Sequence, residues 1–225
     1  MQPLTRSLSI ALLVGTVLLA VGAMLHPILP HDPSEQLRMI AATWYFRPIH
    51  LAMLAGTALI ILGVWTRAFI GPASPPLLAA LALVSLGLCF NAIDIAFMAS
   101  AGNQLAALAK AGNTEVGTLF DSLHRVGLMT ARFGNFLVAL GAIVLSWVER
   151  QEQMRWPSRL AWIAGFVGLF CVLCFQEASL LILAPVTLMP GWQVATALRG
   201  LGVRIPGGPE VRRSGGPAVG GSAST

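Results

Sequence analysis

Long apolar segments alternate with short polar ones along most of the chain. A membrane-spanning helix needs about 20 apolar residues at a rise of about 1.5 Å each. Segments that approach this length are Ser7–Leu25, Pro48–Thr66, Leu77–Met98, Leu128–Trp147, Leu160–Phe175 and Ser179–Leu198. None alternates like a transmembrane β-strand, and helices satisfy their own backbone groups in lipid. We therefore predict an all-α, polytopic transmembrane helical bundle with six spans.

The polar segment between the first two spans contains a helix signal. Asp32, Pro33 and Glu35 stand where an N-cap, an N1 proline and an N3 acid are expected. Apolar residues then follow at helical spacing, at Leu37, Ile40, Ala41 and Trp44. We predict a short interfacial helix on the outer membrane surface, or else a lid that only packs.

The spans form one domain, residues 1–199. The first span is too long for a signal peptide and lacks a small-x-small cleavage site before His26, so we expect it to be retained. Pro185 should kink the last span and Pro190 should break it. Residues 200–225 are rich in Gly, Pro and Ser, and we expect a disordered cytoplasmic tail.

Composition and charge support a membrane protein. The chain is 56% hydrophobic and 10% charged, whereas soluble domains carry about 25% charged residues. The net charge of +5 includes no basic cluster outside the loops and tail, so nucleic acid is not an expected partner. Arginine is more frequent on the side that holds both termini. The positive-inside rule then makes both termini cytoplasmic, in a bacterial inner membrane.

Glycines recur in pairs seven residues apart. Three spans carry such a pair, at Gly15 and Gly22, Gly56 and Gly63, and Gly134 and Gly141. Glycines on one helix face let membrane helices approach closely, so these faces should pack against other helices. The repeated pattern indicates either an internal duplication or chance similarity between apolar segments.

Polar residues gather near the outer ends of the spans. His50, Asp94 and Arg132 each lie about 4–6 Å below the outer edge, counting about 1.5 Å per residue. Asn91 and Asn135 lie about one turn deeper. A charge in lipid usually pairs or faces a wet cavity, so we expect an Asp94–Arg132 ion pair. This layer is either a site for a substrate or a proton or a lock between helices.

Histidines at three outer helix ends suggest a second kind of site. His26, His50 and His124 would hold a metal or haem if they converged, because neutral imidazole is the commonest side-chain metal ligand. The alternative is that each ring binds a carbonyl or a headgroup. The histidines show no metal-binding spacing within one helix.

A C-x-x-C pair, Cys171 and Cys174, lies in the fifth span. It resembles the membrane-embedded thiol pair of the vitamin K epoxide reductase family, which implies thiol redox chemistry. That family also uses a second cysteine pair in a loop, and this chain has only Cys89 besides. The alternative is that both cysteines are small packing residues.

The arrangement Trp44, His50, Gly56 and Gly63 at the second span resembles that of small, uncharacterised six-span membrane proteins of bacteria. The resemblance implies a six-span fold and brings no activity. We favour a small transporter or permease with an outer polar site. The alternatives are a haem- or metal-binding redox protein and a non-catalytic accessory subunit, in a homo-oligomer or a membrane complex. We assign no catalytic residues and favour a non-enzymatic role.

Overall fold

The computed structural model describes residues 2–176 and 179–204, which form helices and connecting turns. Six helical stretches are long and apolar enough to cross a membrane. They are α1 (Pro3–Leu25), α3 with α4 (Phe46–Gly63, Thr66–Phe69), α5 with a π-helical turn and α6 (Pro75–Phe97, Met98–Gly102, Asn103–Lys110), α7 (Val116–Gln151), α8 (Arg155–Cys174), and a 3₁₀ turn with α9 and α10 (Leu180–Leu183, Ala184–Leu188, Pro190–Gly200). The prediction of an all-α, six-span membrane protein is confirmed.

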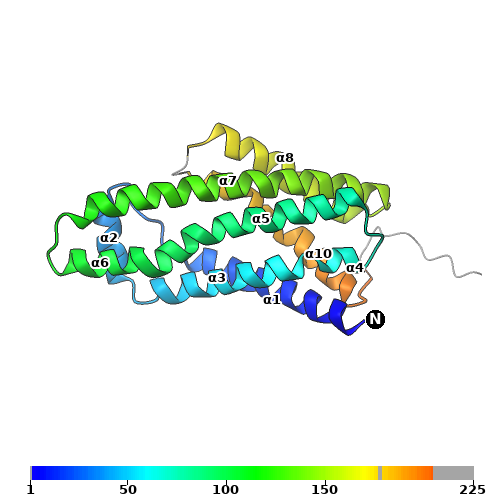
Figure 1. The fold of residues 1–225 in the computed structure, drawn as a ribbon, viewed down its shortest axis with the longest axis horizontal. Coiled ribbons are helices and arrows are strands. Elements are labelled where there is room, and N and C mark those ends of the chain that lie inside the picture. The colour runs from blue at the N-terminus through cyan, green and yellow to red at the C-terminus, as the bar shows by residue number, and fades with distance from the viewer. Residues whose placement is uncertain (1, 177–178, 205–225) are drawn as a thin grey trace, which may run out of the picture.

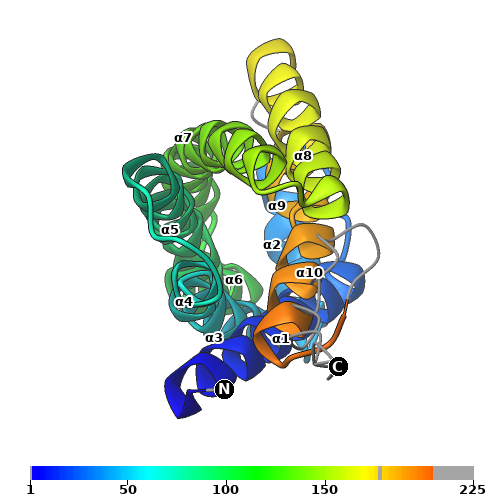
Figure 2. The same ribbon diagram turned by 90° about the vertical axis from the view of Figure 1, so that its right-hand side faces the viewer.

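The helices form a ring when the bundle is viewed along its length (Figure 2). Helix α3 packs between α1 and α5, and α7 packs between α5 and α8. Helices α9 and α10 close the ring, since α9 packs on α8 and α10 packs on α1. Apolar side chains fill the centre, including Leu12, Val84, Leu145 and Trp192.

Glycine faces bring neighbouring helices into close contact, as the sequence predicted. A methyl group on Gly15 would lie 2.6 Å from the Gly56 carbonyl oxygen, so α1 and α3 touch there along their backbones. A methyl group on Gly134 would lie 2.5 Å from the Gly87 carbonyl oxygen, which brings α5 and α7 equally close. Small residues at such crossings stabilise membrane bundles through van der Waals packing.

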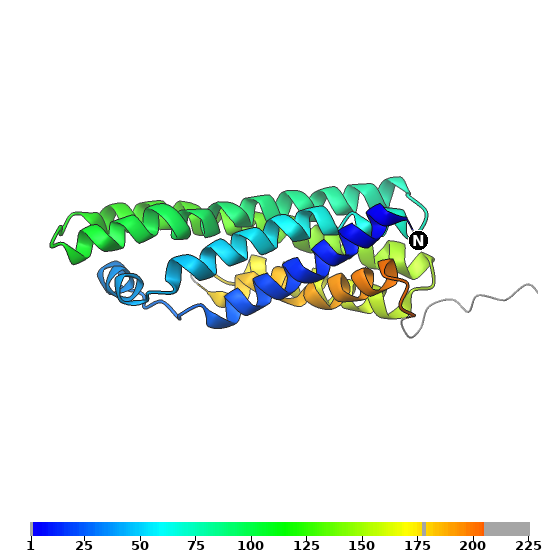
Figure 3. The ribbon, with the colours of Figure 1, turned by 90° about the horizontal axis from the view of Figure 1, so that it is seen from below.

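Helix α7 and the α5–α6 stretch extend well past the other membrane spans at one end, where α2 lies beside them (Figures 1 and 3). The 36 residues of α7 span about 54 Å at 1.5 Å per residue, against a hydrocarbon thickness of about 30 Å. A second apolar cluster stabilises this extension. Its buried members are Leu37, Ile40, Phe46, Met98, Leu105, Ala106, Val116 and Phe120.

The predicted short helix is α2 (Pro33–Ala42), which packs against α6 and α7. Asp32 accepts a hydrogen bond from the Glu35 backbone amide at 2.9 Å, so the N-cap prediction is confirmed. Leu37 and Ile40 are buried as expected, but Trp44 follows the helix and is 86% exposed. The apolar face of α2 therefore covers the α6–α7 extension.

The last span is interrupted as its prolines predict. Pro185 lies in the first turn of α9, and Pro190 lies in the first turn of α10. Pro185 packs against Gly168 of α8. Gly200, at the end of α10, contacts Ser9 near the start of α1, so the chain leaves the bundle at the end where it enters. The predicted disordered tail lies, from residue 205 on, outside the described residues.

Candidate functional site

The two ends of the bundle carry different polar groups. We call the end where α1 finishes and α3 begins the histidine end, because His26, His50 and His124 lie there. We call the opposite end, where α4 lies and α7 and α10 finish, the arginine end.

His26 and His50 form a direct contact between α1 and α3. Their Nε2 atoms lie 3.2 Å apart, and His50 Nδ1 lies 2.7 Å from the Phe46 carbonyl oxygen. A carbonyl oxygen only accepts, so the Nδ1 of His50 carries a hydrogen. A neutral His50 ring then accepts at Nε2, and His26 Nε2 is the donor. The Phe46 carbonyl thus sets the tautomer of a neutral His50 ring.

The two rings differ in their access to water. His50 is 2% exposed and lies against the Phe46 ring, with centroids 4.3 Å apart. His26 follows the last turn of α1 and is partly exposed. Burial lowers the pKa of the His26 imidazole, and an interaction with the Pro27 backbone opposes the shift. His26 is therefore neutral near pH 7, and it connects the surface to a buried imidazole.

His124 lies near this pair without touching it directly. Its ring stacks on Phe97 at 6.3 Å and packs against Phe120 at 5.2 Å. It lies close enough to His26 for their charges to interact. The predicted gathering of the three histidines at one end is therefore present, with only two of them in hydrogen-bond contact.

A metal or haem site at these histidines stays a prediction. In residues 2–176 and 179–204, no three His, Cys, Asp or Glu side chains are grouped so that they could hold a metal ion. The 3.2 Å between the Nε2 atoms of His26 and His50 is shorter than the roughly 4 Å between ligands on opposite sides of a metal, but it matches the roughly 3.3 Å between neighbouring ligands of a tetrahedral metal. The contact is a hydrogen bond between rings.

Asp94 lies on α5 with its carboxylate against Gly127 of α7. Its Oδ1 atom is buried and has no hydrogen-bond partner among the described residues. One turn further along, Phe97 stacks on His124, so Asp94 belongs to the same end of the α5–α7 contact as the histidines. A buried carboxylate oxygen with a free lone pair is chemically unusual and available to a proton or a ligand.

The expected Asp94–Arg132 ion pair is not among the ion pairs of the described residues. Arg132 Nε donates instead to the Val172 carbonyl oxygen of α8, at 3.1 Å. The reason is the angle between Gly127 and Arg132 around the axis of α7. Asp94 meets α7 at Gly127, five residues before Arg132, and five residues turn a helix by about 500°, which leaves the two positions about 140° apart. Equal depth therefore did not place the two side chains on facing sides.

Asn91 and Asn135 form a polar contact deeper in the bundle. Asn135 Nδ2 donates to Asn91 Oδ1 at 3.2 Å, and Asn91 Nδ2 donates to the Gly87 carbonyl oxygen at 3.0 Å. Both side chains are buried. On the other side of the ring, Thr16 Oγ1 donates to Gln193 Oε1 at 2.9 Å between α1 and α10. Polar side chains therefore occur inside the bundle between its two ends.

The two cysteines of the C-x-x-C pair are free thiols with different surroundings. Cys171 is buried and Cys174 is exposed, and Cys89, also free, is exposed on α5. A redox role for Cys171 and Cys174 stays a prediction.

The arginine end contains a buried ion network that the sequence reasoning missed. Arg67 Nε pairs with Glu149 Oε1 at 2.7 Å, and both side chains are fully buried. Arg67 also pairs with Glu152 at 2.6 Å, and Arg199 pairs with Glu149 at 3.3 Å. Trp192 Nε1 donates to Glu149 at 3.3 Å. The network joins α4, α7 and α10, which identifies it as a lock on this end of the ring.

A signal for this network was present in the sequence. Arg67 directly follows the predicted second span, and Glu149 and Glu152 are acids in a segment that is otherwise basic. Their spacing of three residues places them on one side of α7. Acids that interrupt a basic membrane boundary indicate buried partners.

Comparisons of the chain with protein-family models, curated proteins and solved structures find no match. The function is therefore argued from the residues.

Proposed function

We propose that this multi-pass membrane protein is a small proton-linked transport protein whose proton-binding site lies at its histidine end. The observation that carries the proposal is the 3.2 Å contact between the Nε2 atoms of His26 and His50. It joins a partly exposed imidazole to one that is 2% exposed. Chains of histidines and carboxylates carry protons in many membrane transporters.

The chemistry of the pair suits proton exchange. Histidine is the side chain whose charge changes near neutral pH. A proton taken up by His26 from the aqueous side is shared with His50 through the Nε2–Nε2 bond. Asp94 adds a buried carboxylate with an unpartnered oxygen at the same end. These groups supply an entrance and a proton acceptor.

Polar contacts deeper in the bundle support passage beyond this entrance. The Asn91–Asn135 hydrogen bond lies between α5 and α7, and the Thr16–Gln193 hydrogen bond lies between α1 and α10. Amide and hydroxyl groups in a membrane protein can bind water or a small polar solute along a path. The arginine end would face the cytoplasm under the positive-inside rule, which places the histidine end outside.

The test is proton flux into liposomes that contain the purified protein. A pH-sensitive dye inside the vesicles reports uptake, and a potassium gradient with valinomycin supplies the driving voltage. We expect faster acidification than in empty vesicles, and slower uptake in His50→Gln and His26→Gln because each removes a ring nitrogen from the shared bond. His31→Gln is the matched control, since His31 is exposed in the loop that follows α1.

Two results would refute the proposal. One is a flux equal to that of empty vesicles. The other is a wild-type rate in a His50→Gln protein that elutes as a single folded species, because the hydrogen-bonded pair would then be irrelevant to proton movement.

A further inference from the structure

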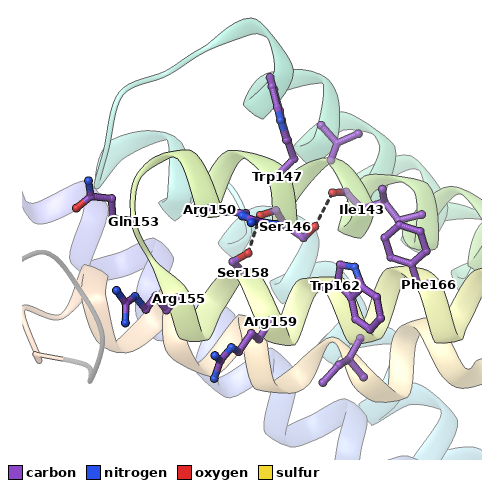
Figure 4. A pocket seen from close by; sticks show the side chains of 12 residues that line it. Ile143, Ser146, Trp147, Arg150, Gln153, Arg155, Ser158, Arg159, Trp162 and Phe166 are labelled. Carbon is purple, nitrogen blue, oxygen red and sulfur yellow. Dashed lines mark hydrogen bonds between the residues drawn. The ribbon is translucent and has the colours of Figure 1, made fainter.

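A groove of about 1080 Å³ runs between α7 and α8 at the arginine end. We propose that it binds an anionic phospholipid, with the lipid phosphate at Arg150, Arg155 and Arg159 and an acyl chain along Trp162 and Phe166. This site lies at the opposite end from the proposed proton site and does not depend on it. Figure 4 shows the three arginines toward one end of the groove and the two aromatic rings toward the other.

The three arginines provide a concentrated positive charge. All three side chains are exposed, and within the described parts of the chain none of them has an ion-pair partner. The Arg159 Cζ atom lies over the Trp156 ring, 5.7 Å from its centroid, which is a cation–π contact. Guanidinium groups bind phosphate oxygens with paired hydrogen bonds.

The nearby carboxylates of Glu149 and Glu152 do not neutralise this charge, because both pair with Arg67. Glu149 is fully buried against Arg67, and Glu152 also pairs with Arg67. The residues that line the groove include no aspartate or glutamate. The buried network thus separates the charges of this region, with carboxylates inside and arginines on the groove.

The remainder of the groove is suited to a hydrocarbon chain. Phe166 lies seven residues after Arg159 on α8, so it is about 10 Å deeper along the helix. Trp162 is 51% exposed and Phe166 is 45% exposed, and both line the groove. Tryptophan favours the boundary between headgroups and hydrocarbon, which matches its place between the arginines and Phe166.

One hydrogen bond joins the two walls of the groove, and a second lies within α7. Ser158 Oγ of α8 donates to the Ser146 carbonyl oxygen of α7 at 2.8 Å, and Ser146 Oγ donates to the Ile143 carbonyl oxygen at 2.9 Å (Figure 4). Deeper in the bundle, Gly165 packs directly against Ile143. A preformed groove with a basic end and an apolar end fits one phospholipid, since basic pockets beside membrane helices bind anionic headgroups.

The experiment uses tryptophan quenching by lipids with brominated acyl chains. The full-length protein is placed in two sets of vesicles with the same ratio of phosphatidylglycerol to phosphatidylcholine. The bromines are on phosphatidylglycerol in one set and on phosphatidylcholine in the other, so the surface charge is identical. One arginine near an anionic surface contributes a factor of about five to binding. We expect a preference for phosphatidylglycerol of about fivefold or more.

Matched variants show which residues produce the preference for phosphatidylglycerol. Arg150→Gln/Arg155→Gln/Arg159→Gln should abolish the preference. A triple variant with the same change in net charge, Arg38→Gln/Arg47→Gln/Arg125→Gln, should keep it, because these exposed arginines lie at the histidine end. Trp147→Phe/Trp162→Phe should also lose the excess quenching, since both rings line the groove. If the groove triple variant does not fold, the single variants Arg155→Gln and Arg159→Gln should each reduce the preference severalfold.

Several results would overturn the proposal. Equal quenching by the two brominated lipids would show that the groove takes any lipid. Equal loss in both arginine triple variants would indicate general attraction to an anionic surface. A preference that survives the groove substitutions would place the lipid elsewhere. A preference that excess inorganic phosphate abolishes would identify a phosphate site rather than a phospholipid site.

Discussion

Arg67 and Glu149, 82 positions apart in the chain, form an ion pair of 2.7 Å in which neither side chain is exposed to solvent. Their contact joins α4 to α7, and Arg199 extends it to α10. Removing one partner of a buried pair costs more than the pair itself contributes, because it leaves the other charge without compensation. This relationship gives the first prediction.

Glu149→Gln should destabilise the protein strongly. The change keeps the size of the side chain but leaves Arg67 with Glu152 alone and Arg199 without its carboxylate. We expect a loss of about 3–5 kcal/mol in the free energy of unfolding, measured by denaturant titration in detergent micelles. Asp121→Asn is the control, since it removes the exposed 2.9 Å pair with Arg125 and should cost less than about 1 kcal/mol. Equal effects of the two substitutions would contradict a locking role.

Gly87→Ala should separate α5 from α7. The added methyl group would come within 2.5 Å of the Gly134 carbonyl oxygen, and backbone cannot move aside as a side-chain end can. We expect a lower melting temperature in detergent. Gly117→Ala is the comparison, because its methyl group would meet only Ser34 Oγ at 3.6 Å. That variant should match or exceed the wild type, as alanine favours a helix by about 1 kcal/mol over glycine. A Gly87→Ala protein as stable as Gly117→Ala would refute the close approach.

Acid should weaken the contact between α1 and α3. Burial lowers the pKa of His26 in the fold, whereas in the unfolded chain the pKa is about 6.5. Above that value both states are neutral and the shift has no effect. As the pH falls through about 6.5, the unfolded chain binds a proton first, so the fold loses stability until His26 is itself protonated. His50 and His124 are further titratable side chains that lie near His26.

The measurement is the melting temperature between pH 8 and pH 5, compared in the wild type and in His26→Gln. The wild type should lose more stability than the variant over this range. A variant with the same slope as the wild type would show that His26 contributes nothing to the pH dependence.

Asp94→Asn should separate stability from function. Asparagine has the same size as aspartate and removes a buried carboxylate whose Oδ1 atom lacks a described partner. We expect an unchanged or higher melting temperature together with slower proton flux in liposomes. A variant that transports at the wild-type rate would remove Asp94 from the proposed site.

Local patterns in the sequence predicted much of the fold. The six spans follow from apolar length, the start of α2 follows from Asp32 and Glu35, and the tight helix contacts follow from Gly15, Gly56 and Gly134. Each of these features depends on residues within a few positions of one another along one helix. Such features can be derived before any tertiary contact is known.

The depth of a residue along its helix is not enough to predict which side chains of other helices it contacts. Asp94 and Arg132 are at similar depth but meet different neighbours, Gly127 and Val172. Arg67 directly follows the predicted second span, and its burial depends on Glu149, which lies 82 residues further along the chain. The rotation of a helix about its own axis decides both cases, and apolar sequence specifies that rotation weakly.

The length of α7 fixes how far the protein reaches from the bilayer. Its 36 residues exceed the hydrocarbon thickness by about 24 Å at 1.5 Å per residue. Electrostatic screening at physiological ionic strength acts over about 8 Å. Lys110 and Glu115, at the tip of the α6–α7 extension, therefore lie where screening weakens the field of the lipid headgroups. A molecule that binds this tip meets its charges much as it would on a water-soluble protein.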